Sequence, residues 1–278
     1  MTNVISFQGE PGAYSHQACA EMYPDMEALP CNTFEEAVAA VKDGRADLAM
    51  LPVENSTYGR VADIHHLLPD TGLHIIGEYF VRVHINLLAV PGTKLAQVDH
   101  AMSHTVLLGQ CRTFLKKHSI QLRTGADTAG SAQKVAEDGN PEVAALASQL
   151  AGEIYGLETL AENIEDNQHN TTRFLVMAPE PKFPAGGDAM TTIVFQVRNI
   201  PAALYKAMGG FATNSVNMLK LESYMLGGTF TATQFYADIE GYPGDPAVDR
   251  ALEELAYFTT HLDILGVYPM SEFRKSVR

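Results

Sequence analysis

The side chains best suited to chemistry gather in two polar segments, each bordering an apolar run. Segment 52–59, PVENSTYG, follows the apolar run 48–51 and offers a carboxylate, an amide and two aliphatic hydroxyls. Segment 168–174, QHNTTRF, leads into the apolar run 174–178 and offers two threonine hydroxyls and one arginine. Hydroxyl donors beside a positive charge suit the binding of a small anion.

Both segments are expected at the mouths of buried strands. Ligands of open α/β sheets collect outside the carboxyl ends of strands, although 52–59 also fits a capped loop in which Asn55 or Ser56 begins the next helix. Strand propensity alone would place Thr and Phe in 171–174. Strict alternation points Thr172 and Phe174 to one face and Arg173 to the other. Arg173 is therefore structural if Thr172 faces the site, unless it contacts a second part of that site.

A third polar group surrounds Ser103. His100 and His104 have the spacing of two metal ligands on a helix, but the Glu of HExxH and an obvious third ligand are missing. Ser103 and His104, with Gln110 two turns later, fit either hydrogen bonds to a carboxylate or a helix cap. The pair His65–His66 is expected at the surface.

The N-terminal segment 9–15, GEPGAYS, follows a predicted strand and opens a predicted helix. Backbone N–H groups favour an anion at such a junction. The alternative is that Gly12 only permits a tight turn. The segment lacks GK[ST] and GxGxxG, so it does not indicate a nucleotide.

The elements that must position these groups alternate between short apolar runs and helical periodicity. Strands are predicted over 4–7 and 48–53, with helices from about Tyr14 and over 33–42, where Thr33 and Glu36 form a capping-box pattern. Further predictions are β-rich 73–90, helices over 104–117 and 127–137, and strands over 142–148 and 173–178. The first 180 residues therefore read as one α/β unit with a parallel sheet.

A Pro- and Gly-rich linker over 179–187 separates this unit from a smaller one. Beyond the linker, strands over 191–197, 216–224, 229–239 and 262–268 and helices over 202–211 and 246–260 follow one another as βαββαβ. A sheet of this type leaves one face and one edge uncovered, which favours pairing with a second copy.

Composition excludes several classes of protein. The 278 residues carry a formal charge of -14, from 19 Lys+Arg and 33 Asp+Glu, which disfavours nucleic acid as a partner. We find neither a membrane span nor a secretory signal. The three cysteines, an odd number without CxxC spacing, indicate neither a disulfide framework nor a thiolate metal cage. A cytoplasmic protein is expected.

Taken in order, these motifs resemble the prephenate dehydratase family. The matching features are a GxxGAYS start, an ENSxxG loop, Ser-His followed by Gln-Cys, Thr-Arg-Phe and a C-terminal ACT domain. The resemblance covers nearly the whole chain. It implies an α/β fold in which a two-lobed, periplasmic-binding-protein-like catalytic domain (1–180) precedes a ferredoxin-like ACT regulatory domain (188–270). Lobe one would comprise about 1–78 plus 160–180, and lobe two about 79–159.

The activity implied is the decarboxylative dehydration of prephenate to phenylpyruvate, without metal or organic cofactor. Thr172 matches the family's catalytic threonine. The other catalytic positions implied are Glu54, Asn55, Ser103 and Gln110, and the substrate-binding positions are Ser15, Ser56, His104, Arg173 and Phe174. Thr105 replaces a proline that often follows Ser-His.

The ACT resemblance implies feedback regulation by L-phenylalanine and a homodimer or homotetramer formed through this domain. Tyr224–Met225 stand where the family commonly has Arg-Pro, which bears on the strength of inhibition. The effector-binding positions implied are Ala203, Leu204, Asn217, Met218, Leu219, Glu222 and Ser223.

The sequence is compatible with three other functions. Arogenate can replace prephenate as substrate. The same fold can serve as an amino-acid sensor without catalysis, or as a secreted solute-binding protein, which the missing signal sequence disfavours.

Overall fold

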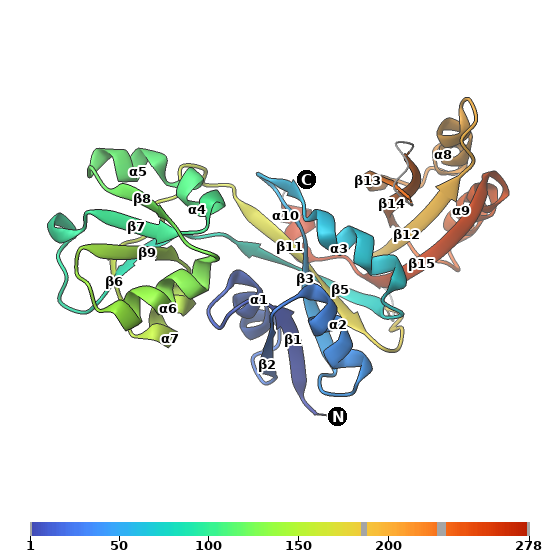
Figure 1. The fold of residues 1–278 in the computed structure, drawn as a ribbon. Coiled ribbons are helices and arrows are strands. Elements are labelled where there is room, and N and C mark those ends of the chain that lie inside the picture. The colour runs from blue at the N-terminus through green and yellow to red at the C-terminus, as the bar shows by residue number, and fades with distance from the viewer. Residues whose placement is uncertain (1, 185–187, 227–231, 277–278) are drawn as a thin grey trace. The chain divides into compact units, whose positions relative to one another are not determined.

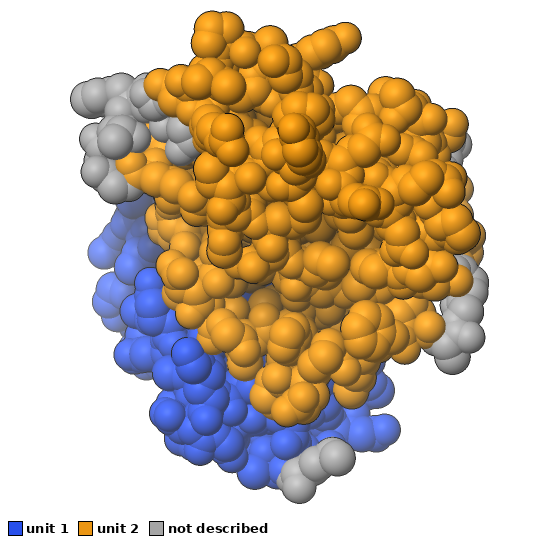
Figure 2. Space-filling view, turned by 90° about the vertical axis from the view of Figure 1, so that its right-hand side faces the viewer, with its two compact units in different colours: residues 1–61, 79–174 blue, residues 62–78, 175–278 orange. Residues whose placement is uncertain are grey.

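The structure is a computed structural model that describes residues 2–184, 188–226 and 232–276. The chain forms two compact units, coloured separately in Figure 2. Unit 1 comprises Met1–Val61 and Tyr79–Phe174, and unit 2 comprises Ala62–Glu78 and Leu175–Arg278. Strands β5 (His74–Arg82) and β11 (Thr171–Ala178) each run from one unit into the other.

The first sheet of unit 1 has the strand order β5-β11-β3-β1-β2, and β1 is parallel to both of its neighbours. Its elements are β1 (Val4–Gln8), α1 (Tyr14–Met22), β2 (Glu27–Cys31), α2 (Phe34–Lys42) and β3 (Leu48–Asn55). The predicted strands and helices of this region are confirmed, except that β2 was not predicted. It is an edge strand, and it contains Pro30, as edge positions allow.

Helix α2 begins where the capping pattern predicts. The Thr33 hydroxyl accepts from the Glu36 backbone N–H at 3.1 Å. The Glu36 carboxylate accepts from the backbone N–H of Asn32, one residue earlier than a capping box requires. Lys42 is the last helical residue.

The second sheet of unit 1 has the order β10-β6-β9-β7-β8. Helices cover both faces of this sheet (Figure 1), and each face has its own apolar core. Leu87 and Leu146 pack with residues of α4 and α5 on one face, and Leu88 packs with residues of α6 and α7 on the other. The elements are β6 (Asn86–Ala89), η2 (Leu95–Gln97), β7 (His100–Ser103), α4 (Thr105–Gln110), α5 (Arg112–Lys117), β8 (Gln121–Thr124), α6 (Thr128–Asp138), β9 (Val143–Ala147), α7 (Gln149–Tyr155) and β10 (Glu158–Ala161).

The helix predicted over 104–117 is two helices. Cys111, with φ -118° and ψ 20°, lies between α4 and α5 and interrupts the helical geometry. The strand predicted over 142–148 is β9, and Asp127 caps α6 as expected for a helix beginning there.

Unit 2 contains the predicted βαββαβ order, which is confirmed. Its sheet has the order β13-β14-β12-β15-β5, and α8 and α9 cover the face that carries Ile193, Phe195 and Ala237. Its elements are β12 (Ala189–Val197), α8 (Ala203–Thr213), β13 (Met218–Met225), β14 (Ala232–Glu240), α9 (Pro246–Phe258), β15 (Thr259–Pro269) and α10 (Glu272–Ser276). Residues 229–231 of the third predicted strand lie outside the described residues, as do 185–187 of the predicted linker. Residues 179–184 of the linker contain neither helix nor strand.

The expectation that His65 lies at the surface is wrong. Helix α3 (Ala62–Leu67), which leads into η1 (Leu68–Asp70), buries His65 to 1% exposure, and His66 is exposed. The His65 ring meets the Tyr236 ring edge-on at 4.9 Å, and its Nδ1 is 2.8 Å from the Tyr224 hydroxyl. A histidine whose ring nitrogen has a hydrogen-bond partner tolerates burial.

Among the residues that the structure describes, none of the helices has the length and apolar character that a membrane crossing requires.

Candidate active site

The segment after β3 forms a tight turn and does not begin a helix. Asn55 ends β3, and its side-chain Oδ1 accepts from the backbone N–H groups of Thr57 and Tyr58 at 2.9 and 3.0 Å. The chain then pairs back as β4 (Gly59–Arg60). Neither Asn55 nor Ser56 caps a helix, because α3 starts only at Ala62.

The turn holds the start of β11 through paired bonds. Ser56 accepts at its hydroxyl from the Thr171 N–H, and its own N–H donates to the Thr171 carbonyl, at 2.9 and 2.8 Å. The Ser56 hydroxyl also donates to the His169 carbonyl. These bonds fix the register of Thr172 against the turn.

Thr172 receives a hydrogen bond from Asn55. The Asn55 Nδ2 donates to the Thr172 hydroxyl oxygen at 3.0 Å and to the Asn170 Oδ1 at 2.6 Å. Thr172 is partly exposed. Among the described residues, none accepts the hydroxyl hydrogen of Thr172, so that hydrogen is available to a ligand.

Arg173 lies on the other face of β11, as alternation predicts. It is 1% exposed, and its guanidinium donates to the Glu54 carboxylate at 3.0 Å. Phe174 is also buried. The positive charge of this motif is therefore engaged with Glu54, and Thr172 is the member that solvent can reach.

The side chains of Ser103, His104 and Gln110 each make a different hydrogen bond. Ser103 is fully buried at the end of β7 and donates to the Leu146 carbonyl at 2.8 Å. His104 is exposed and caps α4, its Nδ1 accepting from the Val106 N–H. Gln110 ends α4 and accepts from the Asn170 side chain at 3.0 Å. His100 lies in β7, so the two histidines do not share a helical face.

The glycine-rich segment packs against helix α7, which lies on one face of the second sheet. Gly12 adopts φ +89°, and a Cβ there would lie 2.7 Å from the Ala151 Cα. The Ser148 hydroxyl donates to the Gly12 carbonyl, and the Tyr155 hydroxyl donates to the Pro11 carbonyl. Ser15 is buried in the first turn of α1. This geometry supports the tight-turn interpretation of Gly12.

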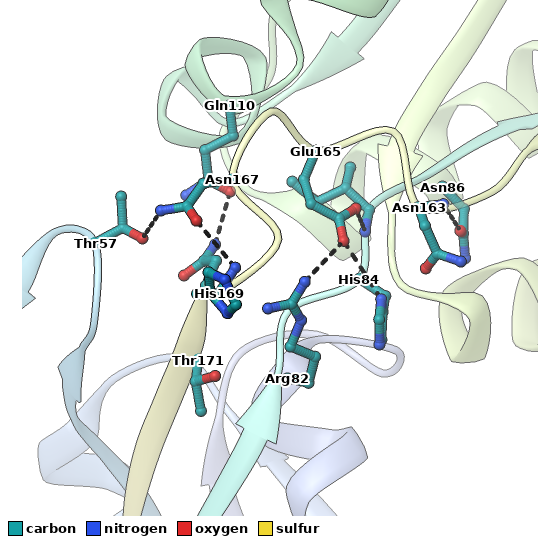
Figure 3. Close-up of polar contacts among 12 residues, drawn as sticks. Thr57, Arg82, His84, Asn86, Gln110, Asn163, Glu165, Asn167, His169 and Thr171 are labelled. Carbon is teal, nitrogen blue, oxygen red and sulfur yellow. Dashed lines mark hydrogen bonds and ion pairs between the residues drawn. The ribbon is translucent and has the colours of Figure 1, made fainter. Parts of the chain in front are cut away.

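Two connecting segments, 82–86 and 162–170, join the two sheets of unit 1 (Figure 3). The Glu165 carboxylate accepts from the Ile85 N–H at 2.9 Å and lies 3.6 Å from Arg82 and 3.4 Å from His84. Asn163 N–H donates to the Asn86 side chain. No sequence motif points to Glu165, because its partners lie about 80 residues away in the chain.

A buried thiol, that of Cys111, and the partly buried phenol of Tyr14 lie beside these connecting segments. Burial, together with the nearby carboxylates Asp166 and Glu165, raises the pKa of the Cys111 thiol. Burial, then Cys111 and Glu165, raise the pKa of Tyr14, whose hydroxyl donates to the His84 carbonyl. All three cysteines are free and buried, and burial raises the pKa of Cys19 to about 12. These thiols stay protonated and unreactive near neutral pH.

In unit 2, the proposed effector positions lie at two places. Ala203 and Leu204 line a cavity of about 300 Å³ together with Asn199, Tyr205 and Phe235. The remaining positions lie on or just before β13: Asn217, Met218, Leu219, Glu222 and Ser223. Met218 and Leu204 also pack against the core beneath α8 and α9.

Comparison with known proteins finds one family over most of the chain. The prephenate dehydratase family model matches residues 5–182. A Komagataeibacter europaeus protein named bifunctional N-acyl-homoserine lactone acylase/prephenate dehydratase is 51% identical over 274 residues, covering 98% of each chain. Arabidopsis thaliana arogenate dehydratase/prephenate dehydratase 1 is 39% identical over 285 residues, covering 97% of this chain and 73% of the Arabidopsis chain. The Arthrobacter aurescens prephenate dehydratase structure in complex with L-Phe has a TM-score of 0.88 at 30% identity, covering 97% and 90% of the two chains.

Proposed function

Because the chain belongs to the prephenate dehydratase family of hydro-lyases, we propose that it converts prephenate to phenylpyruvate, carbon dioxide and water. In this reaction the bond between the ring and its carboxylate breaks, and the released electron pair restores the aromatic ring. The ring hydroxyl leaves and takes up a proton to become water. Since aromatisation drives the reaction, the enzyme chiefly assists the departing oxygen.

The direction of the bond between Asn55 and Thr172 is the observation that carries the proposal. Asn55 donates to Thr172, so the threonine oxygen acts as acceptor and keeps its own hydrogen. A donor on that oxygen also stabilises the charge that develops there as the hydrogen moves away. Thr172 is therefore the group that donates to the departing hydroxyl, and solvent returns the proton afterwards.

The other proposed residues support Thr172 or hold substrate. Glu54 and Arg173 form the ion pair behind the site, and Ser56 fixes the strand register. Ser103 joins β7 to β9, and Gln110 reaches the site through Asn170. We assign Ser15, His104 and Phe174 to the substrate-binding surroundings, where His104 is exposed and the other two are buried.

The direct test is to incubate the protein with prephenate near neutral pH and to measure phenylpyruvate. Appearance of phenylpyruvate well above the uncatalysed rate supports the proposal, and its absence contradicts it. Arogenate is assayed in parallel, with phenylalanine as the product measured, because the Arabidopsis relative is named for both substrates. The ratio of the two kcat/KM values identifies the preferred substrate.

We also propose that residues 188–270 form an ACT domain that binds L-phenylalanine and inhibits the enzyme. The βαββαβ order and the cavity beside Ala203 and Leu204 support this assignment, as does the relative solved with L-Phe. A coupling of about 1–3 kcal/mol would give useful inhibition. Asn217→Ala should relieve inhibition and leave the uninhibited rate unchanged; retained sensitivity would exclude this residue from the effector site.

The same domain is our candidate for assembly into a homodimer or homotetramer. β13 ends the sheet order of unit 2, and Leu221 and Met225 on it are exposed. Terminal strands of a sheet that expose apolar side chains favour association with a second copy. Sedimentation velocity should give a dimer or tetramer, and a monomer at micromolar concentration would refute this assignment.

The three buried free cysteines fit the reducing cytoplasm that we propose as the compartment.

A second candidate activity rests on the name of the Komagataeibacter relative, which includes N-acyl-homoserine lactone acylase. At 51% identity over 98% of both chains, the same amide hydrolysis is a candidate here. The buried cysteines would not serve as nucleophiles, so a hydroxyl or water would attack the amide. Incubation with an N-acyl-homoserine lactone should release free homoserine lactone and fatty acid. Absence of both would exclude the activity, and comparison with Thr172→Ala would show whether one site serves both reactions.

A further inference from the structure

Three side-chain amides form a continuous chain between the two sheets of unit 1. Asn55, beside Thr172 on the first sheet, donates to Asn170, and Asn170 donates to Gln110 at the end of α4. The distances are 2.6 and 3.0 Å. Asn170 directly precedes β11, and its side chain meets that of Gln110 there. No sequence motif assigns a role to Asn170.

The direction of this chain is fixed from one end. The backbone N–H groups of Thr57 and Tyr58 can only donate, so the Asn55 atom that faces them is the oxygen. The Asn55 nitrogen must then face Thr172 and Asn170, which makes the facing atom of Asn170 an oxygen. The Asn170 nitrogen consequently faces Gln110, and the Gln110 oxygen receives it.

Burial makes this direction costly to reverse. Asn170 is 2% exposed, and its backbone carbonyl accepts from the Val83 N–H at 2.9 Å. Reversing any amide in the chain would place two donors or two acceptors against each other. An unsatisfied buried polar group is destabilising. The amide chain therefore holds one orientation.

The orientation leaves one useful group at each end. Thr172 accepts from Asn55 and keeps its hydroxyl hydrogen. The Gln110 side-chain oxygen accepts from Asn170. None of the described residues accepts from the Gln110 Nε2, so this nitrogen remains a donor. Two hydrogen-bond donors, one from β11 and one from the end of α4, are the groups that a substrate with carboxylates and a departing hydroxyl requires.

We propose that Asn170 is a positioning residue that sets the direction of this amide chain, so that Gln110 and Thr172 both present donors to the substrate. The inference rests on the proposed dehydratase activity. It predicts that reversing the polarity at residue 170 weakens substrate binding through Gln110, in addition to any effect on turnover.

The sharpest test is Asn170→Asp, which preserves shape and the acceptor for Asn55. The ionised carboxylate at position 170 offers Gln110 only an acceptor. The Gln110 amide therefore turns to donate its nitrogen to this carboxylate, and its oxygen then faces the substrate. At about pH 8 we expect kcat/KM for prephenate to fall about 10- to 100-fold, mostly through a higher KM. Position 170 is buried, which raises the pKa of the introduced carboxyl above the ordinary Asp value of about 3.9. As the pH falls toward about 5, protonation of this carboxyl restores a donor, and at least about half of this loss on a logarithmic scale should be recovered.

Asn170→Ala is the matched control, because it removes the same contacts and cannot titrate. It should lose activity without recovery at low pH, beyond whatever pH dependence the unaltered enzyme has. The proposal is overturned if Asn170→Asp retains full kcat/KM at about pH 8, or if its pH profile parallels that of Asn170→Ala. Thermal unfolding of both variants identifies any loss that is only structural.

A substrate-free measurement separates this inference from the proposed function. The chain predicts slow hydrogen exchange of the Asn55 and Asn170 side-chain amides by NMR, with faster exchange at Asn55 in Asn170→Ala. Rapid exchange in the unaltered protein overturns the inference even if prephenate is converted. Slow exchange in a protein that converts neither prephenate nor arogenate supports the amide chain and refutes the proposed function.

Discussion

Two threonines, one in each unit, lie in buried sheets within polar networks, and the direction of their hydrogen bonds differs. Thr192 in β12 is fully buried, donates to an Asp238 oxygen at 2.6 Å and lies 2.7 Å from the Tyr268 hydroxyl. Thr172 in β11 is partly exposed and accepts from Asn55. A hydroxyl whose hydrogen is already engaged stabilises the fold, whereas one that accepts from a neighbour keeps its hydrogen for a ligand. Direction and exposure, rather than residue type, distinguish the candidate catalytic group.

The comparison predicts opposite outcomes for the same substitution. Thr172→Val should lower kcat for prephenate about 10²- to 10⁴-fold, because the donor to the substrate is lost. The free energy of unfolding should change little, because Asn55 loses Thr172 as an acceptor but still donates to Asn170. Thr192→Val should leave kcat unchanged and lower the free energy of unfolding by about 1–3 kcal/mol, because Asp238 and Tyr268 lose a buried partner. Steady-state kinetics and urea unfolding check the pair. Equal effects on activity would remove the distinction.

Ion pairs extend the contrast. In unit 2, Arg274 contacts Glu78 through Nε and a terminal nitrogen at 2.7 and 2.9 Å, and the Glu78 side chain is fully buried. Arg274→Ala should lower the free energy of unfolding by about 3–5 kcal/mol, since it leaves a buried carboxylate without this partner. Urea unfolding measures the loss, with Arg274→Lys as a control that retains the charge. A loss below about 1 kcal/mol would mean that the pair resembles an exposed one.

The close contact between Gly12 and Ala151 of helix α7 can be tested by substitution at Gly12. Gly12→Ala combines a positive φ with a Cβ that would clash with Ala151, so we expect a loss of about 2–4 kcal/mol and a raised KM for prephenate. Gly139 is the control, because it has φ +62° and open space around its Cβ position. Gly139→Ala should cost only about 1–2 kcal/mol and leave KM unchanged. Similar results for both variants would show that the Ala151 contact has no special weight.

The smallest effect concerns pH. The His16 Nδ1 accepts from the Gly12 N–H at 3.0 Å, and burial lowers the pKa of this histidine below its usual 6.5. The unfolded chain therefore binds the proton more readily, so this stabilisation is complete above the unfolded pKa and is lost as pH falls through the folded pKa. Urea unfolding from about pH 7.5 to 5 should show a smaller decline in His16→Gln, which cannot titrate over this range, than in the unaltered protein. Parallel declines would exclude His16 as a contributor.

Local signals predicted much of the fold, and distant contacts account for what they missed. The start of α2 follows from Thr33, whose side chain contacts a backbone group three residues away. Strand β2 was missed because Pro30 opposes strand formation until an edge position accommodates it. His65 was misplaced because its partner, Tyr224, lies 159 residues away in the chain.

The candidate site shows the same division. The resemblance supplied Thr172 and Asn55, and alternation along β11 predicted that Arg173 would face away from Thr172. Sequence reasoning could not supply Asn170, because its side-chain partners lie 60 and 115 residues away. Nor could it supply the direction of the amide chain, which depends on two backbone N–H groups in a turn.

Donation by the residue 172 hydroxyl is most directly tested by kcat and KM for prephenate in Thr172→Ser and Thr172→Ala. The serine variant retains a hydroxyl and should keep kcat within about tenfold of the unaltered enzyme, whereas the alanine variant should lose about 10²- to 10⁴-fold in kcat with KM nearly unchanged. Unimpaired kcat in Thr172→Ala, or a loss confined to KM, would contradict the account.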